Sequence, residues 1–261
     1  MIVAAFDTET TSKDETRSIV ELGIVKWDTE TDPRAEVKTY CQRFKPRELI
    51  TYGAMGVHHI TEGEVENCPG IEERINEIFK FVEDADIMMA HNLPFDMEVF
   101  TREVTGDPNF FGLTLDTLRL ARHTWDRLPD YRLASLRYRF DLICDKSRHA
   151  DPDAPYLPAS LVASQHSAGF DAYLCLAMAS ACQKTLDMPW KDLPAKAASP
   201  LTVRIMNFGK CNGMEVSEMV VTERGYAEWL LRQPWLQEER PDLKWTLLGL
   251  MRKKGEKKVD G

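Results

Sequence analysis

The apolar positions at the start of the chain form one short run and two further β-like stretches. Residues 2–7 are apolar up to an acidic end, and residues 19–27 and 36–44 carry alternating or β-rich patterns. Alternation with a period of two is typical of a strand with one buried face, and a short apolar run is typical of a buried strand. The pattern therefore predicts three strands, for which an antiparallel meander is the simplest arrangement.

Helical spacing first appears at residues 71–83, where five apolar positions would share one face: Ile71, Ile75, Ile78, Phe79 and Val82. A short apolar run at 86–90 predicts a buried strand, and another strand is expected at 112–115. A helix is expected to begin near Pro94, because proline suits the first position of a helix. Further helices are expected at 116–124, 132–140 and roughly 168–186, with an irregular, proline-containing loop at 144–165.

A change of composition follows the last of these helices. Pro189, Pro194 and Pro200 punctuate a stretch that is typical of a linker. Beyond it, Asn212-Gly213 is a strong signal for a two-residue hairpin, and helical patterns return at 224–233 and 240–252. The predicted organisation is a first domain, a linker and a small C-terminal α+β domain, at residues 1–187, 188–200 and 201–261.

The charge balance of the chain limits which classes of function are compatible with the sequence. The chain has 261 residues, of which 29% are charged, and a formal net charge of −9. This balance argues against a protein that coats nucleic acid through bulk charge. It is compatible with an enzyme that acts on nucleic acid, because bound cations offset a cluster of metal-binding carboxylates.

The expected compartment is the cytoplasm. The N-terminus enters an apolar strand directly, without the basic stretch and cleavage site of a secretion signal. No segment reaches the length of a membrane span, so no membrane partner is expected. The six cysteines lack CxxC spacing, which favours reduced thiols over a disulfide framework.

Four carboxylates and one histidine carry the candidate chemistry. Asp7 and Glu9 are two residues apart, so on a strand they point to the same face. Asp96 falls in the first turn of the helix at Pro94, where the helix dipole alone would explain an acidic residue. Asp171 is equally unremarkable by itself. No single member of the set is a strong signal of a functional site. The informative feature is that all five residues occur together.

The spacing between His166 and Asp171 separates their roles. Five residues of an ideal helix turn through about 500°, which leaves two side chains roughly 140° apart. Both residues therefore cannot share a site from inside one regular helix. We expect His166 on the preceding loop and Asp171 inside the helix. A histidine on a loop suits proton transfer better than rigid metal ligation.

Carboxylates gathered in this way repel one another unless cations are present. Mg²⁺ is the expected ion and Mn²⁺ a substitute, because hard ions accept carboxylate oxygens and retain water. Two such ions, about 4 Å apart, could activate a water and stabilise the leaving oxygen at a phosphodiester. The sequence thus predicts a two-metal site formed by four carboxylates, Asp7, Glu9, Asp96 and Asp171.

Three segments resemble the motifs of the DnaQ-like exonuclease superfamily, in its DEDDh subgroup: FDTET, HNLPFD and HSAGFDA. A sister subgroup has tyrosine four residues before the last aspartate, where this chain has Ser167. The resemblance spans about residues 1–186. It implies a ribonuclease H-like α/β fold, with a mixed five-stranded sheet flanked by helices. It also implies a 3′→5′ exonuclease that releases nucleoside 5′-monophosphates, with His166 as general base.

The resemblance extends to the substrate pocket. The segment GVHHIT (56–61) is similar to the family segment that lines the pocket for the 3′-terminal nucleotide. His58 and His59 are accordingly expected in a loop that contacts substrate and not in a metal site. We expect substrate contacts from Thr8, Val57, His58, Asn92 and Phe95. Asn92 is also expected to cap the helix that carries Asp96.

The C-terminal part resembles the small domain appended to the exodeoxyribonuclease X group, through NFGKCNG and GYAEWLL. This makes single-stranded DNA with a free 3′ end the first choice of substrate. Its tryptophans are expected in the core of that domain: Trp229, Trp235 and Trp245. The lysine-rich end is either a solvated tail or a phosphate handle for a single strand.

Two alternatives are compatible with the same motifs. One is an exonuclease for RNA or short oligonucleotides, since the residues that would sense the sugar 2′ position are not evident from the sequence. The other is a proofreading or binding subunit of a polymerase or repair complex. A stable co-purifying polymerase, with the isolated chain inactive, would favour the second.

Overall fold

The computed structural model describes residues 1–31, 37–143, 155–158, 161 and 167–256. It divides into two compact units, Met1–Ala198 and Ser199–Gly261, which are described separately below. In the part of the chain described, no helix is both long enough and apolar enough to cross a membrane.

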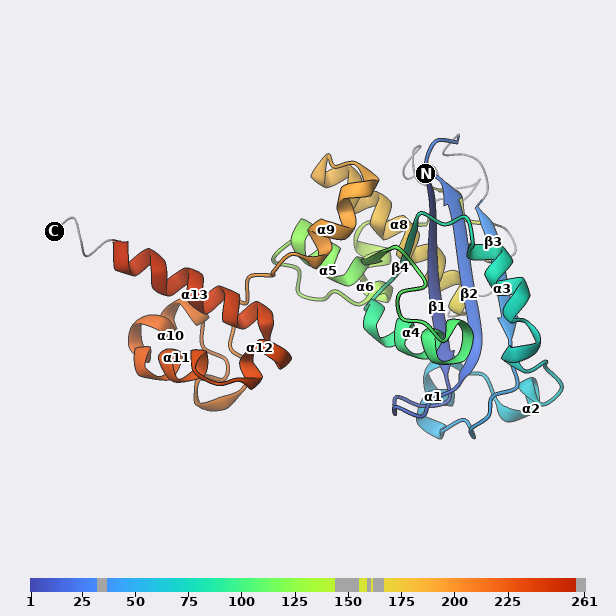
Figure 1. Ribbon diagram of the computed structural model, residues 1–261, viewed down its shortest axis with the longest axis horizontal. Coiled ribbons are helices and arrows are strands. Elements are labelled where there is room, and N and C mark those ends of the chain that lie inside the picture. The colour runs from blue at the N-terminus through green and yellow to red at the C-terminus, as the bar shows by residue number, and fades with distance from the viewer. Residues whose placement is uncertain (32–36, 144–154, 159–160, 162–166, 257–261) are drawn as a thin grey trace. The chain divides into compact units, whose positions relative to one another are not determined.

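The first unit is built on a mixed sheet, which Figure 1 shows with its strands in blue and green. Among the described residues the strand order is β3-β2-β1-β4-β5. The first three strands pair antiparallel, as predicted, whereas β4 and β5 run parallel to β1. The strands are β1 (Ile2–Thr10), β2 (Ile19–Asp28), β3 (Lys38–Arg43), β4 (Ile87–Ala90) and β5 (Leu113–Asp116). The predicted five-stranded α/β sheet is confirmed.

Alternate residues of β1 belong to two different cores, one on each face of the sheet. Val3 and Ala5 pack with the core that includes α8 (Ala168–Leu186). Ala4 and Phe6 pack with the core on the opposite face. Because side chains alternate along a strand, Asp7 continues the face of Val3 and Ala5. β1 therefore turns its acidic end toward α8.

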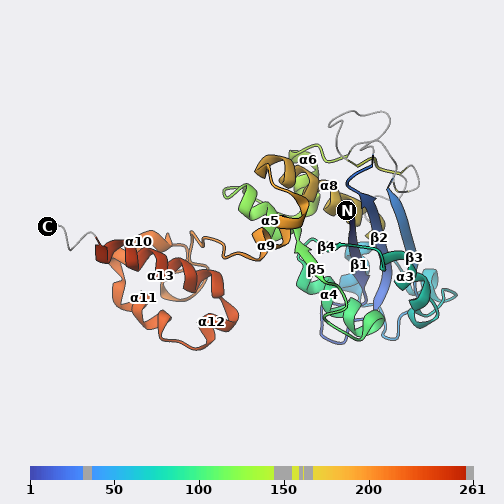
Figure 2. The ribbon, with the colours of Figure 1, turned by 45° about the horizontal axis from the view of Figure 1, so that its top comes forward.

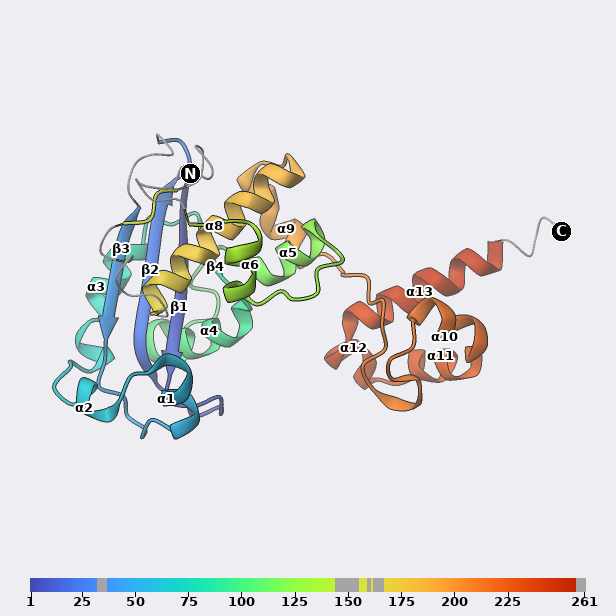
Figure 3. The same cartoon turned by 180° about the vertical axis from the view of Figure 1, so that it is seen from behind.

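Helices cover both faces of the sheet, as Figures 2 and 3 show from two further directions. The α8 face also carries α5 (Thr117–Thr124), α6 (Leu133–Arg139) and α9 (Leu193–Ala198). The opposite face carries α3 (Ile75–Val82), α4 (Leu93–Phe100) and the π-helical turn η2 (Thr101–Thr105). Nearly every residue of the first three turns of α8 is buried, so this helix forms the centre of its layer.

Two helical predictions in this unit need correction. The expected helix at 71–83 is two elements, η1 (Ile71–Glu73) and α3, separated by Arg74. The segment expected as a loop around His58 contains α1 (Tyr52–His58), and α2 (Glu62–Val65) follows it. Two glycines weaken the helical propensity of α1. The Thr51 side chain offsets this by accepting a hydrogen bond from the Ala54 amide.

The predicted linker is also largely helical. It contains η3 (Trp190–Asp192) and α9, and the side chains of Leu193 and Ala197 are buried in the first unit. Pro189 and Pro194 stand at the starts of these helices, where proline is favoured, and do not interrupt them. The boundary between the two units falls after Ala198.

The second unit is mainly helical in its described part. Its elements are η4 (Gly209–Cys211), α10 (Val216–Thr222), α11 (Arg224–Leu231), α12 (Trp235–Glu239) and α13 (Pro241–Glu256). The β-structure that the structure describes here is one isolated bridge between Ile205 and Glu215. The two-residue hairpin predicted at Asn212-Gly213 is wrong, because η4 lengthens the connection. Gly213 is the last residue of this connection and has a left-handed backbone, with φ of 85°.

The tryptophans of this unit differ from the prediction. Trp235 is half-buried and packs edge-on against Phe208. Trp229 and Trp245, expected in the core, are 44% and 50% exposed. The buried positions are taken by smaller residues on the inner faces of α10, α11 and α13, among them Met219, Leu230 and Leu247.

Candidate active site

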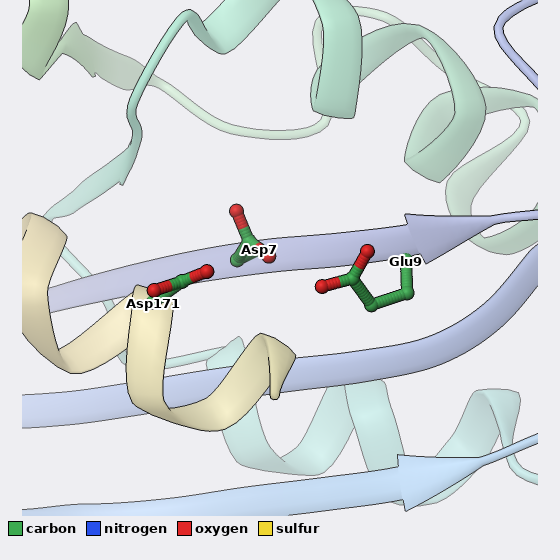
Figure 4. Close-up of side chains that lie close together, drawn as sticks. All are labelled: Asp7, Glu9 and Asp171. Atoms are coloured by element: carbon green, nitrogen blue, oxygen red, sulfur yellow. The ribbon is translucent and has the colours of Figure 1, made fainter. Parts of the chain in front are cut away.

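Three carboxylates meet where the end of β1 faces the start of α8. One carboxylate oxygen from each of Asp7, Glu9 and Asp171 lies within 4.8 Å of the other two. Figure 4 shows the three side chains turned toward one another, two from β1 and one from α8. The strand extends to Thr10, three residues beyond the predicted end. Glu9 therefore keeps the strand geometry that places it on the same face as Asp7.

The start of α8 sets the position of Asp171. Ser167 is the N-cap, and its hydroxyl accepts a hydrogen bond from the Phe170 amide at 3.4 Å. The Asp171 amide bonds to the Ser167 carbonyl at 3.0 Å, so Asp171 lies inside the helix, as expected. His166, the predicted general base, lies outside the described residues.

Asp96 lies beside this group and is held by Thr8. Asp96 falls in the first turn of α4 and is 4% exposed. Its Oδ1 accepts hydrogen bonds from the Thr8 amide at 3.0 Å and the Thr8 hydroxyl at 2.6 Å. Thr8 stands between Asp7 and Glu9 but points to the other face of the sheet. The same strand thus supplies two carboxylates and the clamp for a third.

The pKa values of Asp7, Glu9 and Asp96 are raised, by burial in each case and by repulsion from neighbouring carboxylates for Asp7 and Glu9. The pKa of Asp7 is raised well above its usual value by burial, and then by the charges of Asp96 and Asp171. Burial, followed by the charge of Asp171, raises the pKa of Glu9 to about 8. Burial raises the pKa of Asp96 to about 6, against the hydrogen bonds from Thr8. A divalent cation would relieve this repulsion, so the donor set fits a hard metal ion.

A pocket of about 460 Å³ opens beside Glu9. Its wall is formed by the end of β1, the following loop at 12–14, the length of α1 and Phe95 of α4. Four of the predicted substrate-contact residues line it: Thr8, Val57, His58 and Phe95. The fifth, Asn92, is not among the residues that line this pocket.

Asn92 forms the turn between β4 and α4. It stands at the N-cap position of α4 in the left-handed conformation, with φ of 71°. Its side chain makes no capping hydrogen bond, so the predicted side-chain cap is wrong. Instead, its backbone amide donates a hydrogen bond to Oδ1 of Asp116 at 3.2 Å. The left-handed backbone turns the chain sharply from β4 into α4.

Two histidines lie near the site, of which His58 is buried and His91 is partly buried. Nδ1 of His58 accepts a hydrogen bond from the Ile60 amide at 3.0 Å. His91 lies between the Thr117 hydroxyl and the Tyr131 carbonyl, at 3.0 and 2.8 Å. Burial lowers the pKa of both imidazoles. Both are therefore neutral at pH 7 and suit packing and hydrogen bonding.

Arg17 is a supporting residue that the sequence did not indicate. It is 3% exposed and donates to the carbonyls of Asp14 and Phe95 at 3.0 and 2.9 Å. Its guanidinium lies 4.2 Å from the centre of the Phe95 ring and pairs with Glu98. Arg17 therefore links two sides of the pocket, the loop that contains Asp14 and the start of α4 that contains Phe95. A single arginine in a polar loop gives no signal of such contacts in the sequence.

The family model described as exonuclease (RNase_T) matches residues 4–154. The chain belongs to this exonuclease family. The matched stretch contains Asp7, Glu9 and Asp96, while Asp171 lies beyond it. The DnaQ-like exonuclease expected from the motifs is confirmed at the level of the family. This family depends on divalent metal ions, and the acidic cluster agrees with that dependence.

Individual relatives are similar over most of the chain. Exodeoxyribonuclease 10 of Escherichia coli is 26% identical over 203 residues, which cover 78% of this chain and 80% of that protein. Exonuclease X in complex with 5′ overhanging duplex DNA has a TM-score of 0.54 at 22% identity, covering 75% of this chain and 99% of that one. E. coli ExoI, zinc-bound with single-stranded DNA, has a TM-score of 0.53 at 18% identity, covering 71% and 42%. The predicted ribonuclease H-like fold is confirmed.

Proposed function

We propose that this exonuclease removes nucleotides from the 3′ end of single-stranded DNA in a reaction that requires Mg²⁺, with Mn²⁺ as a substitute. The observation that carries the proposal is the convergence of Asp7, Glu9 and Asp171 beside an open pocket. Oxygen ligands of this kind suit a hard divalent ion. The pocket would take the terminal nucleotide, next to the carboxylates that would hold the ions.

In this proposal each residue of the set has one task. Asp7, Glu9, Asp96 and Asp171 would hold two Mg²⁺ ions. Bound ions of this kind stabilise negative charge on the attacking and leaving oxygens of a phosphodiester. His166 accepts a proton from the attacking water. The bond between phosphorus and the 3′ oxygen breaks, which yields a nucleoside 5′-monophosphate and a shortened strand with a 3′ hydroxyl.

The residues around the pocket position the substrate. Phe95 and Val57 provide apolar surface that a base or sugar would contact. The Thr8 hydroxyl keeps Asp96 in place through its hydrogen bond. Arg17 holds the Phe95 backbone, so the apolar wall stays at a fixed distance from Glu9. Fixed positioning of a reacting bond next to its catalytic groups is a large part of enzymatic rate enhancement.

DNA is favoured as the substrate by the relatives. The similar protein from E. coli is named as an exodeoxyribonuclease, and the similar structures contain overhanging duplex DNA or single-stranded DNA. An RNA exonuclease would use the same carboxylates, with different contacts to the sugar 2′ position.

The direction and the polymer can be tested with strands of one sequence, made as DNA and RNA and labelled at either end. In Mg²⁺ we expect a 3′ label to appear at once as a mononucleotide, while a 5′ label appears in a ladder of shortening strands. DNA should be degraded faster than RNA. Internal cuts, or early release of the 5′ label, would contradict the proposal, and faster loss of RNA would favour the RNA alternative.

A further inference from the structure

A further buried carboxylate, Glu21, lies on β2 next to the site. Glu21 is directly opposite Glu9 in the antiparallel pairing of β1 and β2, and it is 8% exposed. Like charges directly opposite each other across two strands are destabilising. Burial of a charged group costs further free energy unless it is paired and hydrogen-bonded. The position of Glu21 therefore calls for a compensating contact.

The compensating contacts run in two directions. One oxygen of Glu21 accepts a hydrogen bond from the Ala168 amide at 2.8 Å, and Ala168 is the first residue of α8. The other accepts from Nε of Arg43 on β3 at 3.0 Å. Arg43 also pairs with Glu64 of α2 at 3.0 Å. Both oxygens of Glu21 thus accept hydrogen bonds from the protein. Glu21 therefore does not present an unpaired oxygen to a metal ion.

The contact with Ala168 fixes the end of α8 that carries Asp171. The first amides of a helix have no partner within the helix, and its N-terminus attracts negative charge. The Glu21 carboxylate satisfies one of these amides one turn before Asp171. It is a direct polar link between β2 and the start of α8.

Two glycines set how closely α8 approaches the sheet. A Cβ on Gly23 would lie 2.2 Å from the backbone of Ala168 and Gly169. A Cβ on Gly169 would lie 2.3 Å from Sγ of Cys41 on β3. Gly23 is paired with Asp7 in the sheet, so this close contact lies level with the site. Figure 3 shows the start of α8 lying across β2.

We propose that Glu21, held by Arg43, is a positioning residue that keeps the first turn of α8 at the distance from β1 at which Asp171 completes the metal site. This inference rests on the proposed function. The apolar residues of α8 already attach the helix as a whole to the core. The contribution of Glu21 is therefore local and concerns the placement of Asp171 more than the stability of the fold. Ångström-scale misplacement of a reacting group costs about 100-fold in rate.

The test compares Glu21→Ala, Glu21→Gln and Glu21→Asp with the control Glu64→Gln. The control removes a charge from the same arginine but leaves the bond to Ala168. In the metal-free protein, hydrogen exchange of the Ala168 amide should accelerate in Glu21→Ala. The middle of α8 should exchange as in the wild type. Mn²⁺ affinity and kcat should both fall about 10- to 100-fold, with KM for DNA little changed.

The other variants make the result specific. Glu21→Gln keeps an oxygen that can accept from Ala168, so it should recover much of the Mn²⁺ affinity. Glu21→Asp keeps the charge but is one methylene shorter, and it should lose kcat even if Glu21→Ala does not fold. Wild-type Ala168 exchange with wild-type Mn²⁺ affinity in Glu21→Ala, or wild-type kcat in Glu21→Asp, would overturn the inference. Amide exchange and Mn²⁺ binding also report on Glu21 if the wild type degrades no nucleic acid, which would overturn the proposed function alone.

Discussion

At the scale of single residues, the protonation of the acidic groups in the site depends on whether cations are bound. The pKa of Glu9 is raised to about 8 by burial and by Asp171, and the pKa of Asp7 is raised as well. In the unfolded chain these groups ionise near pH 4. Between those values the folded state retains protons that the unfolded state has lost, so the free energy of unfolding falls as pH rises.

This linkage predicts a specific pH dependence for the metal-free protein. From pH 6.5 to 8 its melting temperature should fall, and Glu9→Gln should reduce the slope. Saturating Mg²⁺ should also reduce it, because the ion takes the place of the protons. Below pH 6.5 His58 and His91, whose pKa values are lowered, contribute the opposite trend, so the window begins there. Calorimetry checks this, and a melting temperature that rises through the window in EDTA would contradict it.

The residues of the site differ in how far the sequence could predict them. Acidic residues at the end of an apolar run are visible without a structure, as Asp7 and Glu9 are, whereas Asp171 was predicted as part of the set and of the motif HSAGFDA. The clamp of Thr8 on Asp96 and the contacts of Arg17 join residues far apart in the sequence. No local pattern encodes such partners. The same holds for the bond between Glu21 and Ala168.

At the scale of elements, the strongest patterns were predicted best. The long apolar helix expected at roughly 168–186 has those bounds in α8, because such a helix must be buried on nearly all sides. The short helices α5 and α6 were predicted to within one residue, but α1 was missed, since it has two glycines and depends on the Thr51 cap. The prolines of the supposed linker begin η3 and α9. Proline disfavours a helix interior but suits its start, and the sequence alone did not separate these cases.

At the scale of the whole molecule, each unit has a hydrophobic core of its own. The described core residues of the second unit all lie between Val203 and Met251. Each of the site carboxylates and pocket residues belongs to the first unit. We propose that the first unit is an independent exonuclease domain, and that the second serves a separate purpose. This agrees with the modular organisation common in chains of this length.

Truncation after Ala198 tests this division. Residues 1–198 alone should unfold cooperatively and should degrade short single strands with a kcat close to that of the full chain. The full chain, measured beside it under the same salt and Mg²⁺, is the control. Aggregation of the truncated protein, or a large loss of kcat on short strands, would show that the second unit completes the first.

The most direct test of the central claim is the release of labelled mononucleotide from 3′-labelled single-stranded DNA by the wild type and by Asp7→Asn. The wild type should be active in Mg²⁺ and silent in EDTA. Asp7→Asn should lose about 4 kcal/mol of transition-state stabilisation, or about 1,000-fold in rate, by weakening the bound ions. Its metal-free melting temperature should not fall, because asparagine replaces a carboxyl group whose raised pKa already favours the neutral, protonated form. Cleavage that persists in EDTA, or an Asp7→Asn variant as active as the wild type, would contradict the account.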